Sequence, residues 1–135
     1  MNREECLKQI KKIEIGYLAT YDCTQKMPRV RPIDMGTQYN GLIYFSTFAN
    51  TNKVKELESF KNVEVYFGND DGQIRVNGEV NKVTDLTIRK KFLDDNKVMK
   101  DMFRDENNDD FVLYSINPIL FRIMGSNDSE YNIVR

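Results

Sequence analysis

Residues 28–53, PRVRPIDMGTQYNGLIYFSTFANTNK, carry the strongest structural signal in this chain. The β-prone residues at 30–33 and 42–45 predict two strands, since such runs pack well on a pleated sheet. Asn40 and Gly41 lie between them, and this pair tolerates the positive φ that a two-residue hairpin turn requires. The stretch therefore predicts a hairpin at its centre.

A helix is expected after the second strand, beginning near Lys53. Thr51 or Asn52 can serve as its N-cap, because a side-chain oxygen can accept a hydrogen bond from the N–H groups of the first turn. Ser46 and Thr47 end the preceding strand, so hydroxyl groups lie just before the helix. A helix start with hydroxyls before it and a cation beside it suits a phosphate group. Taken alone, each signal is also consistent with an ordinary turn and a solvated lysine.

Arg29 and Arg31 are two residues apart on the first predicted strand, so their side chains share a face. Two interpretations remain open from the residues alone. The pair can form a solvated edge that discourages aggregation. It can also bind an anion, since the guanidinium group of arginine is a bidentate partner of phosphate.

Outside this stretch, hydrophobic periodicity predicts further helices and strands joined by short loops. Gly78 interrupts the alternation of one long strand and predicts a β-bulge there. The tail at residues 131–134 can pack back on its own chain or pair with a partner. Helices are expected at residues 4–13 and from 85 to about 103, the latter broken near Asn96, and strands at 17–21, 63–67, 73–83, 111–116 and 119–124.

The composition narrows the possible functions. A net charge of −1, from 20 basic and 21 acidic residues, argues against binding to nucleic acid or to an anionic membrane surface. Two cysteines, no apolar run of membrane-spanning length and no signal peptide favour a cytoplasmic protein. Histidine is absent, which excludes Ser-His-Asp sites and histidine-ligated zinc or haem, and no metal site is expected.

Roughly six strands and three helices, without regular βαβ alternation, predict a mainly β, α+β fold. We expect a six-stranded antiparallel barrel with peripheral helices, in one domain spanning residues 1–135. A barrel of this size has no room inside for a cofactor, because even eight-stranded barrels are largely filled by side chains. A ligand would therefore bind outside the barrel or at a dimer interface.

Several short motifs occur in an order that resembles one known family. They are IGYLAT at 15–20, PRVRP at 28–32, IYFST at 43–47 followed by Lys53, VEV at 63–65 and RVNGEV at 75–80. Over about residues 7–124 the chain is similar to the pyridoxamine 5′-phosphate oxidase-like split β-barrel flavoproteins. The resemblance implies a split β-barrel and a homodimer that holds FMN in two clefts between its subunits.

The resemblance also implies which residues would contact FMN. Asn52 and Lys53 would bind the phosphate at the helix start, Arg31 would lie near the phosphate or ribityl chain, and Gln73 would lie against the isoalloxazine ring. Because hydride or electron transfer would be the chemistry of the flavin, no catalytic side chain is assigned. The full set of expected contacts is Arg29, Arg31, Pro32, Ile33, Asp34, Ser46, Thr47, Asn52, Lys53 and Gln73.

Asn52 departs from the basic residue that the true oxidases have before the lysine, which implies weaker phosphate binding. Two other departures argue against pyridoxamine phosphate oxidase activity itself. Gly36 replaces a lysine near the flavin, and the sequence ends at Arg135 without the segment that carries substrate-binding Arg and His residues. We therefore expect an FMN-dependent oxidoreductase with an unassigned small-molecule substrate or electron donor. The alternatives are a non-catalytic flavin-binding sensor or store and a small-barrel interaction protein. A deazaflavin or haem in the same cleft also stays open.

Overall fold

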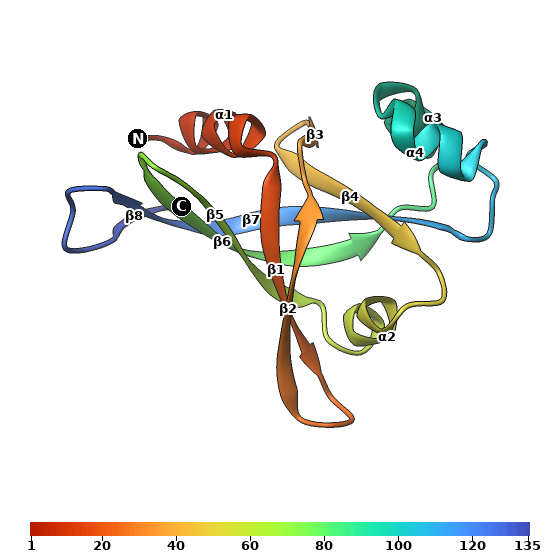
Figure 1. Cartoon of the computed structure of the whole chain (residues 1–135), viewed down its shortest axis with the longest axis horizontal. Helices are drawn as coiled ribbons and strands as arrows, with labels where there is room; N and C mark the ends of the chain where they lie inside the picture. Colours follow the sequence, from red (N-terminus) through yellow and green to blue (C-terminus); the bar gives the residue numbers. More distant parts are fainter.

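The computed structural model describes residues 1–135 and contains eight strands and four helices (Figure 1). The helices are α1 (Arg3–Ile13), α2 (Asn52–Ser59), α3 (Leu86–Asp95) and α4 (Lys97–Phe103). The strands are β1 (Ile15–Asp22), β2 (Met27–Asp34), β3 (Thr37–Tyr39), β4 (Leu42–Phe48), β5 (Asn62–Asn69), β6 (Gly72–Lys82), β7 (Phe111–Gly125) and β8 (Asn132–Val134).

The strands form one sheet in the order β2-β1-β5-β6-β7-β4-β3, with β8 added beside β7. Every neighbouring pair is antiparallel. The architecture confirms the predicted α+β split β-barrel with peripheral helices. The sheet has more strands than the six expected, because β3 and β8 are three residues long and too short to show an alternating pattern.

Strand β7 runs unbroken through Pro118, where the sequence predicts two strands separated by a bend. Proline cannot donate a ladder hydrogen bond and is normally confined to edges or bulges. Its partner is Gly78 on β6, and the register shifts between Asn77 and Gly78, which confirms the predicted bulge. A Cβ at position 78 would lie 2.8 Å from the carbonyl oxygen of Asn117, so only glycine fits without displacing β7.

The turn at Asn40 and Gly41 is confirmed, with φ of 52° and 79° at the two residues. The strand before it is not the predicted run at residues 30–33. The turn joins β3 to β4, whereas β2 pairs with β1 along its whole length. Residues 35 and 36 leave the sheet between β2 and β3, and this separates the two arms that the sequence predicts as one hairpin.

The four helices pack on two separate hydrophobic clusters. Ile10 of α1 and Leu57 of α2 belong to the larger cluster, which fills the barrel. Phe92 of α3 and Phe103 of α4 belong to the smaller one. Figure 1 shows α3 and α4 on the far side of β4 from α2, so β4 carries core side chains on both of its faces. None of the four helices combines the length and apolar character needed to cross a membrane.

Arg89 ties α3 to the loop that precedes β7. Its buried guanidinium group donates hydrogen bonds to the carbonyl oxygens of Glu106 and Phe111, both at 2.9 Å. Two longer bonds reach the carbonyl oxygens of Val83 at 3.5 Å and Asn108 at 3.4 Å. A buried charge is costly unless hydrogen-bonded partners surround it. The four carbonyl oxygens supply these partners to Arg89, and the bonds hold the loop before β7 against α3.

Candidate functional site

The start of α2 lacks the side-chain cap that the sequence predicts. Thr51 occupies the N-cap position with an extended backbone, but its side chain accepts no bond from the first turn. The Thr51 hydroxyl donates instead to the carbonyl oxygen of Phe48 at 3.1 Å. The expectation of a capping hydrogen bond is therefore wrong. The first N–H groups of α2 have no side-chain acceptor and can bind an external anion.

Lys53 lies in the first turn of α2 and points back to the end of β4. Its Nζ donates a hydrogen bond to the Thr47 hydroxyl at 2.7 Å, and no carboxylate lies within ion-pair distance of it. Burial lowers the pKa of Lys53 below its usual value, the Arg31 guanidinium lowers it further, and Glu56 opposes the shift. A cation that is partly buried beside another cation is stabilised by a bound anion.

Arg31 belongs to a closed hydrogen-bonded triad with Thr20 and Glu56. Its Nη1 donates to the Thr20 hydroxyl and its Nη2 to Glu56 Oε1, both at 2.7 Å. The Thr20 hydroxyl in turn donates to the same carboxylate oxygen at 2.6 Å. Thr20 and Glu56 are 4% and 7% exposed, so the arginine is held by a desolvated carboxylate.

Thr20 and Glu56 are not among the site residues predicted from the sequence, although both carry a recognisable signal. Thr20 falls on the inward alternation of β1, two residues after the buried Leu18. Glu56 lies between Val54 and Leu57 on the inward side of α2 and is the only acidic side chain buried there. A carboxylate on the apolar side of a helix is rarely left unpaired. Arg31 is the cation that pairs with Glu56.

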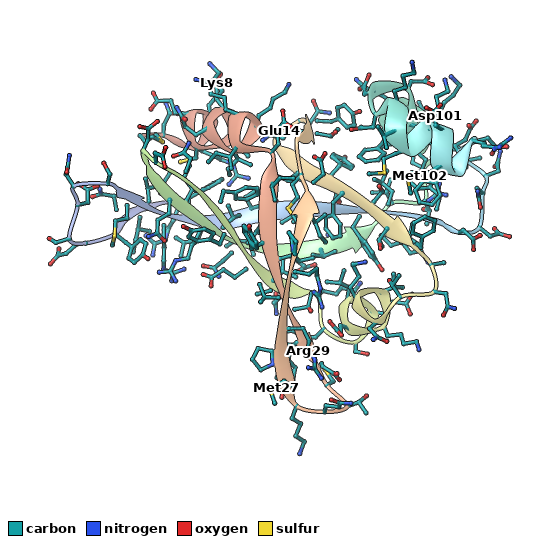
Figure 2. The ribbon with its side chains drawn as sticks, in the orientation of Figure 1. Lys8, Glu14, Met27, Arg29, Asp101 and Met102 are labelled. Carbon is teal, nitrogen blue, oxygen red and sulfur yellow. The ribbon has the colours of Figure 1, made fainter.

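The structure separates Arg29 from this site. The Arg29 guanidinium donates to Gln25 Oε1 at 2.6 Å and to Asp22 Oδ2 at 3.4 Å, both near the turn between β1 and β2. Figure 2 shows Arg29 on the part of this hairpin that projects beyond the sheet, with Met27 farther out. The two arginines share a strand face but do not converge on one anion.

The remaining contacts expected on β2 lie on both of its faces. Ile33 packs against the larger hydrophobic cluster and shares its face with Arg31. Pro32 and Asp34 point the other way and are exposed. Asp34 Oδ1 accepts a hydrogen bond from the backbone N–H of Gly36 at 3.0 Å, which fixes the chain as it leaves the strand.

Ser46 and Thr47 also point to opposite faces of β4. Phe45, two residues before Thr47, lies in the larger cluster, whereas Tyr44, two residues before Ser46, lies in the smaller one. The Thr47 side chain therefore faces Lys53. The Ser46 hydroxyl is buried without a hydrogen-bond partner on the side of the smaller cluster. Only the Thr47 hydroxyl joins Lys53 at the start of α2.

Gln73 lies on the outer face of β6, because its neighbour Ile74 is buried in the larger cluster. Tyr131 packs back from the C-terminal segment, and its hydroxyl donates to Gln73 Oε1 at 3.1 Å. The Arg75 guanidinium lies 4.3 Å from the centre of the Tyr131 ring. Arg31 and Lys53 lie on the core side of the sheet. Within one chain, Gln73 therefore lies on the opposite face of the sheet from these two cations.

The outer face of the sheet carries exposed apolar and aromatic side chains beside Arg75, two residues along β6 from Gln73. Val30, Tyr17 and Tyr66 are 68%, 46% and 39% exposed and line a groove whose polar residues include Arg75. The two tyrosine rings lie with their centres 6.3 Å apart. The Nε of Arg75 is buried without a hydrogen-bond partner. The groove therefore exposes apolar and aromatic side chains beside a guanidinium group whose Nε has no hydrogen-bond partner within the chain.

The comparisons with known proteins agree with the fold. The sequence matches the family profile described as pyridoxamine 5′-phosphate oxidase over residues 3–124. No curated protein sequence matches the chain.

Three solved structures illustrate the structural similarity. A NimC/NimA family protein from Clostridium acetobutylicum is 22% identical with a TM-score of 0.83, and the match covers 98% of this chain and 90% of that one. General stress protein 26 from Bacillus anthracis is 23% identical with a TM-score of 0.71, covering 89% and 94%. A protein related to general stress protein 26 from Clostridium acetobutylicum is 12% identical with a TM-score of 0.78, covering 97% and 92%.

At these identities the solved structures show a shared fold. The family profile spans most of the sequence, and the order and pairing of the strands agree with a split β-barrel. The chain therefore belongs to the pyridoxamine 5′-phosphate oxidase family of split β-barrel proteins.

Proposed function

We propose that this protein binds FMN and acts as an FMN-dependent oxidoreductase on a small molecule. The observation that carries the proposal is Lys53, a partly buried cation with no carboxylate partner, beside the uncapped start of α2. The Thr47 hydroxyl orients the lysine, and the Arg31 guanidinium lies close enough to lower its pKa. A phosphate dianion would receive charge-assisted hydrogen bonds from both cations and from the helix N–H groups. When bound, FMN would supply the hydride or electron transfer.

A second chain would complete the site. Gln73 lies on the outer face of the sheet, whereas Lys53 and Arg31 lie on the core side. One FMN would therefore contact Lys53 and Arg31 of one subunit through its phosphate and Gln73 of the other subunit through its ring. The groove lined by Val30, Tyr17, Tyr66 and Arg75 on this outer face is the surface that a second copy would cover. We therefore propose a homodimer with FMN at the subunit interface.

Fluorescence titration of the purified protein with FMN tests the binding proposal. We expect saturation at about one FMN per chain, with affinity for riboflavin lower because riboflavin lacks the phosphate that Lys53 attracts. Equal affinity for FMN and riboflavin would contradict the phosphate site. Reduction of the bound flavin by a nicotinamide donor, faster than free FMN is reduced, would distinguish an oxidoreductase from a non-catalytic flavin-binding protein.

The homodimer can be tested at Val30. Because this side chain is 68% exposed, Val30→Lys leaves folding intact but places a charge in the apolar groove. We expect light scattering to show a dimer for the unaltered protein and a monomer for Val30→Lys, with FMN binding weakened in parallel. Val98→Lys on α4, at a position 69% exposed, is the matched control and should remain dimeric. A stable FMN-bound monomer of the unaltered chain would refute the proposal.

The pKa of Lys53 predicts how FMN affinity depends on pH. Because the pKa is lowered, the lysine loses its proton and its attraction for phosphate at a pH below its ordinary value of 10.5. We therefore expect FMN affinity to fall as the pH rises toward this value. Lys53→Arg keeps its charge throughout this range, so its affinity should not show the same decline. An identical decline in the two proteins would assign the titration to another group.

A further inference from the structure

Arg75 is a cation on the outer face of the sheet that has no anionic partner within the chain. Its Nε is buried without a hydrogen-bond partner, and the Tyr131 ring supports the guanidinium group from one side. Glu64 is the only acidic residue that lines the same groove, and it lies 4.0 Å from Arg122 and not within ion-pair distance of Arg75. Because buried polar groups are nearly always hydrogen-bonded, this unsatisfied donor indicates a partner from outside the chain.

The strand pairing places a second cation beside the first. Arg75 of β6 and Arg122 of β7 are direct cross-strand partners, so their side chains share the outer face. Like charges in this arrangement destabilise a sheet. Arg122 is compensated, because it donates to Asn77 Oδ1 and has the Glu64 carboxylate nearby. Two guanidinium groups and one carboxylate leave one unbalanced positive charge, and it belongs to Arg75.

The rest of the groove is suited to a flat, apolar molecule. Tyr17, Tyr66 and Val30 line it beside Arg75, and its volume of about 420 Å³ is that of a small-molecule site. Its open side is the side that the second copy would cover in the proposed homodimer. Covering a guanidinium group that has no anion would be costly. An anionic ligand in the groove would remove this cost.

We propose that Arg75 binds the carboxylate of the substrate and that the substrate class is a small aromatic carboxylate. The single unbalanced charge matches a carboxylate, which is a monoanion, better than a phosphate dianion. The inference rests on the proposed function, because it names the substrate of the same flavin site. Gln73, the expected contact of the flavin ring, lies two residues from Arg75 on the same face, about 7 Å along the strand. A carboxylate bound to Arg75 would therefore place the aromatic body of a small substrate beside the flavin ring.

Binding of benzoate to the FMN-loaded protein tests the inference, with benzamide as a neutral molecule of the same shape. Both affinities are measured by ligand-observed NMR titration at low ionic strength, where charge interactions are least screened. We expect the unaltered protein to bind benzoate about tenfold more tightly than benzamide, because hydrogen bonds between charged groups are the stronger ones. Arg75→Gln should abolish this preference and leave the affinity for benzamide unchanged.

Two variants control the experiment. Arg104→Gln removes the same charge at the exposed end of α4 and should keep the preference for benzoate. Arg75→Lys keeps the charge without the bidentate geometry, so it should retain a reduced preference. The absorption spectrum of bound FMN gives a second measurement. Benzoate should shift it in the unaltered protein and not in Arg75→Gln, because the ligand would lie beside the flavin ring.

Each outcome bears on a different claim. Equal affinity of the FMN-loaded, unaltered protein for benzoate and benzamide would overturn this inference and leave the proposed function standing. A preference for benzoate that persists in Arg75→Gln would also overturn it, because the anion would then bind elsewhere. An equal loss of affinity for both molecules in Arg75→Gln would show that the substitution disrupts the groove, and would overturn the specific role of the charge. If the folded, unaltered protein retains no FMN, the proposed function fails and this inference fails with it.

Discussion

Replacing both Arg31 and Lys53 by alanine is expected to lower the affinity for FMN by about 100-fold or more. Lys53 lies in the first turn of α2, and Arg31 lies close enough to lower its pKa. Each buried charge pair with a phosphate contributes on the order of 2 kcal/mol or more to binding. Removal of Arg31 also leaves the Glu56 carboxylate without its cation, and this charge would then repel the phosphate. Fluorescence titration and the amount of FMN retained after desalting measure the effect.

The fold of this double variant must be verified, because an unpaired buried carboxylate destabilises a protein by about 3–5 kcal/mol. A triple variant that adds Glu56→Gln removes that charge and should recover stability but not FMN affinity. Lys8→Ala combined with Lys12→Ala is the control for net charge, since both lysines are exposed on α1. Unchanged FMN affinity in a folded variant lacking Arg31 and Lys53 would refute the phosphate site.

The largest loss of stability is expected from Arg89→Met. The methionine fills much of the space, but the carbonyl oxygens of Glu106 and Phe111 lose their buried donors. Each buried acceptor left without a hydrogen bond costs about 1–3 kcal/mol. We therefore expect the free energy of unfolding to fall by about 3–5 kcal/mol, measured by urea denaturation.

Lys90→Met is the matched control for this substitution. Lys90 is the next residue of α3, and its ammonium group forms an exposed ion pair with Asp94 at 2.9 Å. Exposed pairs of this kind contribute little, so the control should unfold close to the midpoint of the unaltered protein. Equal stability of Arg89→Met and Lys90→Met would show that the carbonyl contacts of Arg89 do not hold the loop.

Local sequence patterns predicted most of the fold. Alternation located β1, β5 and β6, the Asn40-Gly41 turn was placed correctly, and the glycine at position 78 marked the bulge. The pairing across residues 28–45 was wrong, because the choice of β1 as the partner of β2 depends on contacts distant in sequence. The sequence predicts two strands in place of β7, because proline normally interrupts a strand. That Pro118 lies opposite Gly78, 40 positions earlier in the chain, can be seen only from the strand pairing.

The site was less predictable than the fold. The closeness of Lys53 and Thr47 followed from the sequence, because a strand end and a helix start are joined by a short loop. Glu56 escaped detection because a helical glutamate is normally solvent-exposed and only the approach of Arg31 makes its burial favourable. The position of Gln73 on the opposite face could be inferred only after β6 was placed against the core.

The central claim is that FMN binds to this chain, and it is tested most directly by the visible absorption spectrum of the purified protein after addition of FMN and desalting. We predict a retained flavin spectrum at about one FMN per chain, with the released ligand identified as FMN. A folded dimer that retains no flavin would contradict the account, and the family relationship would then describe the fold alone.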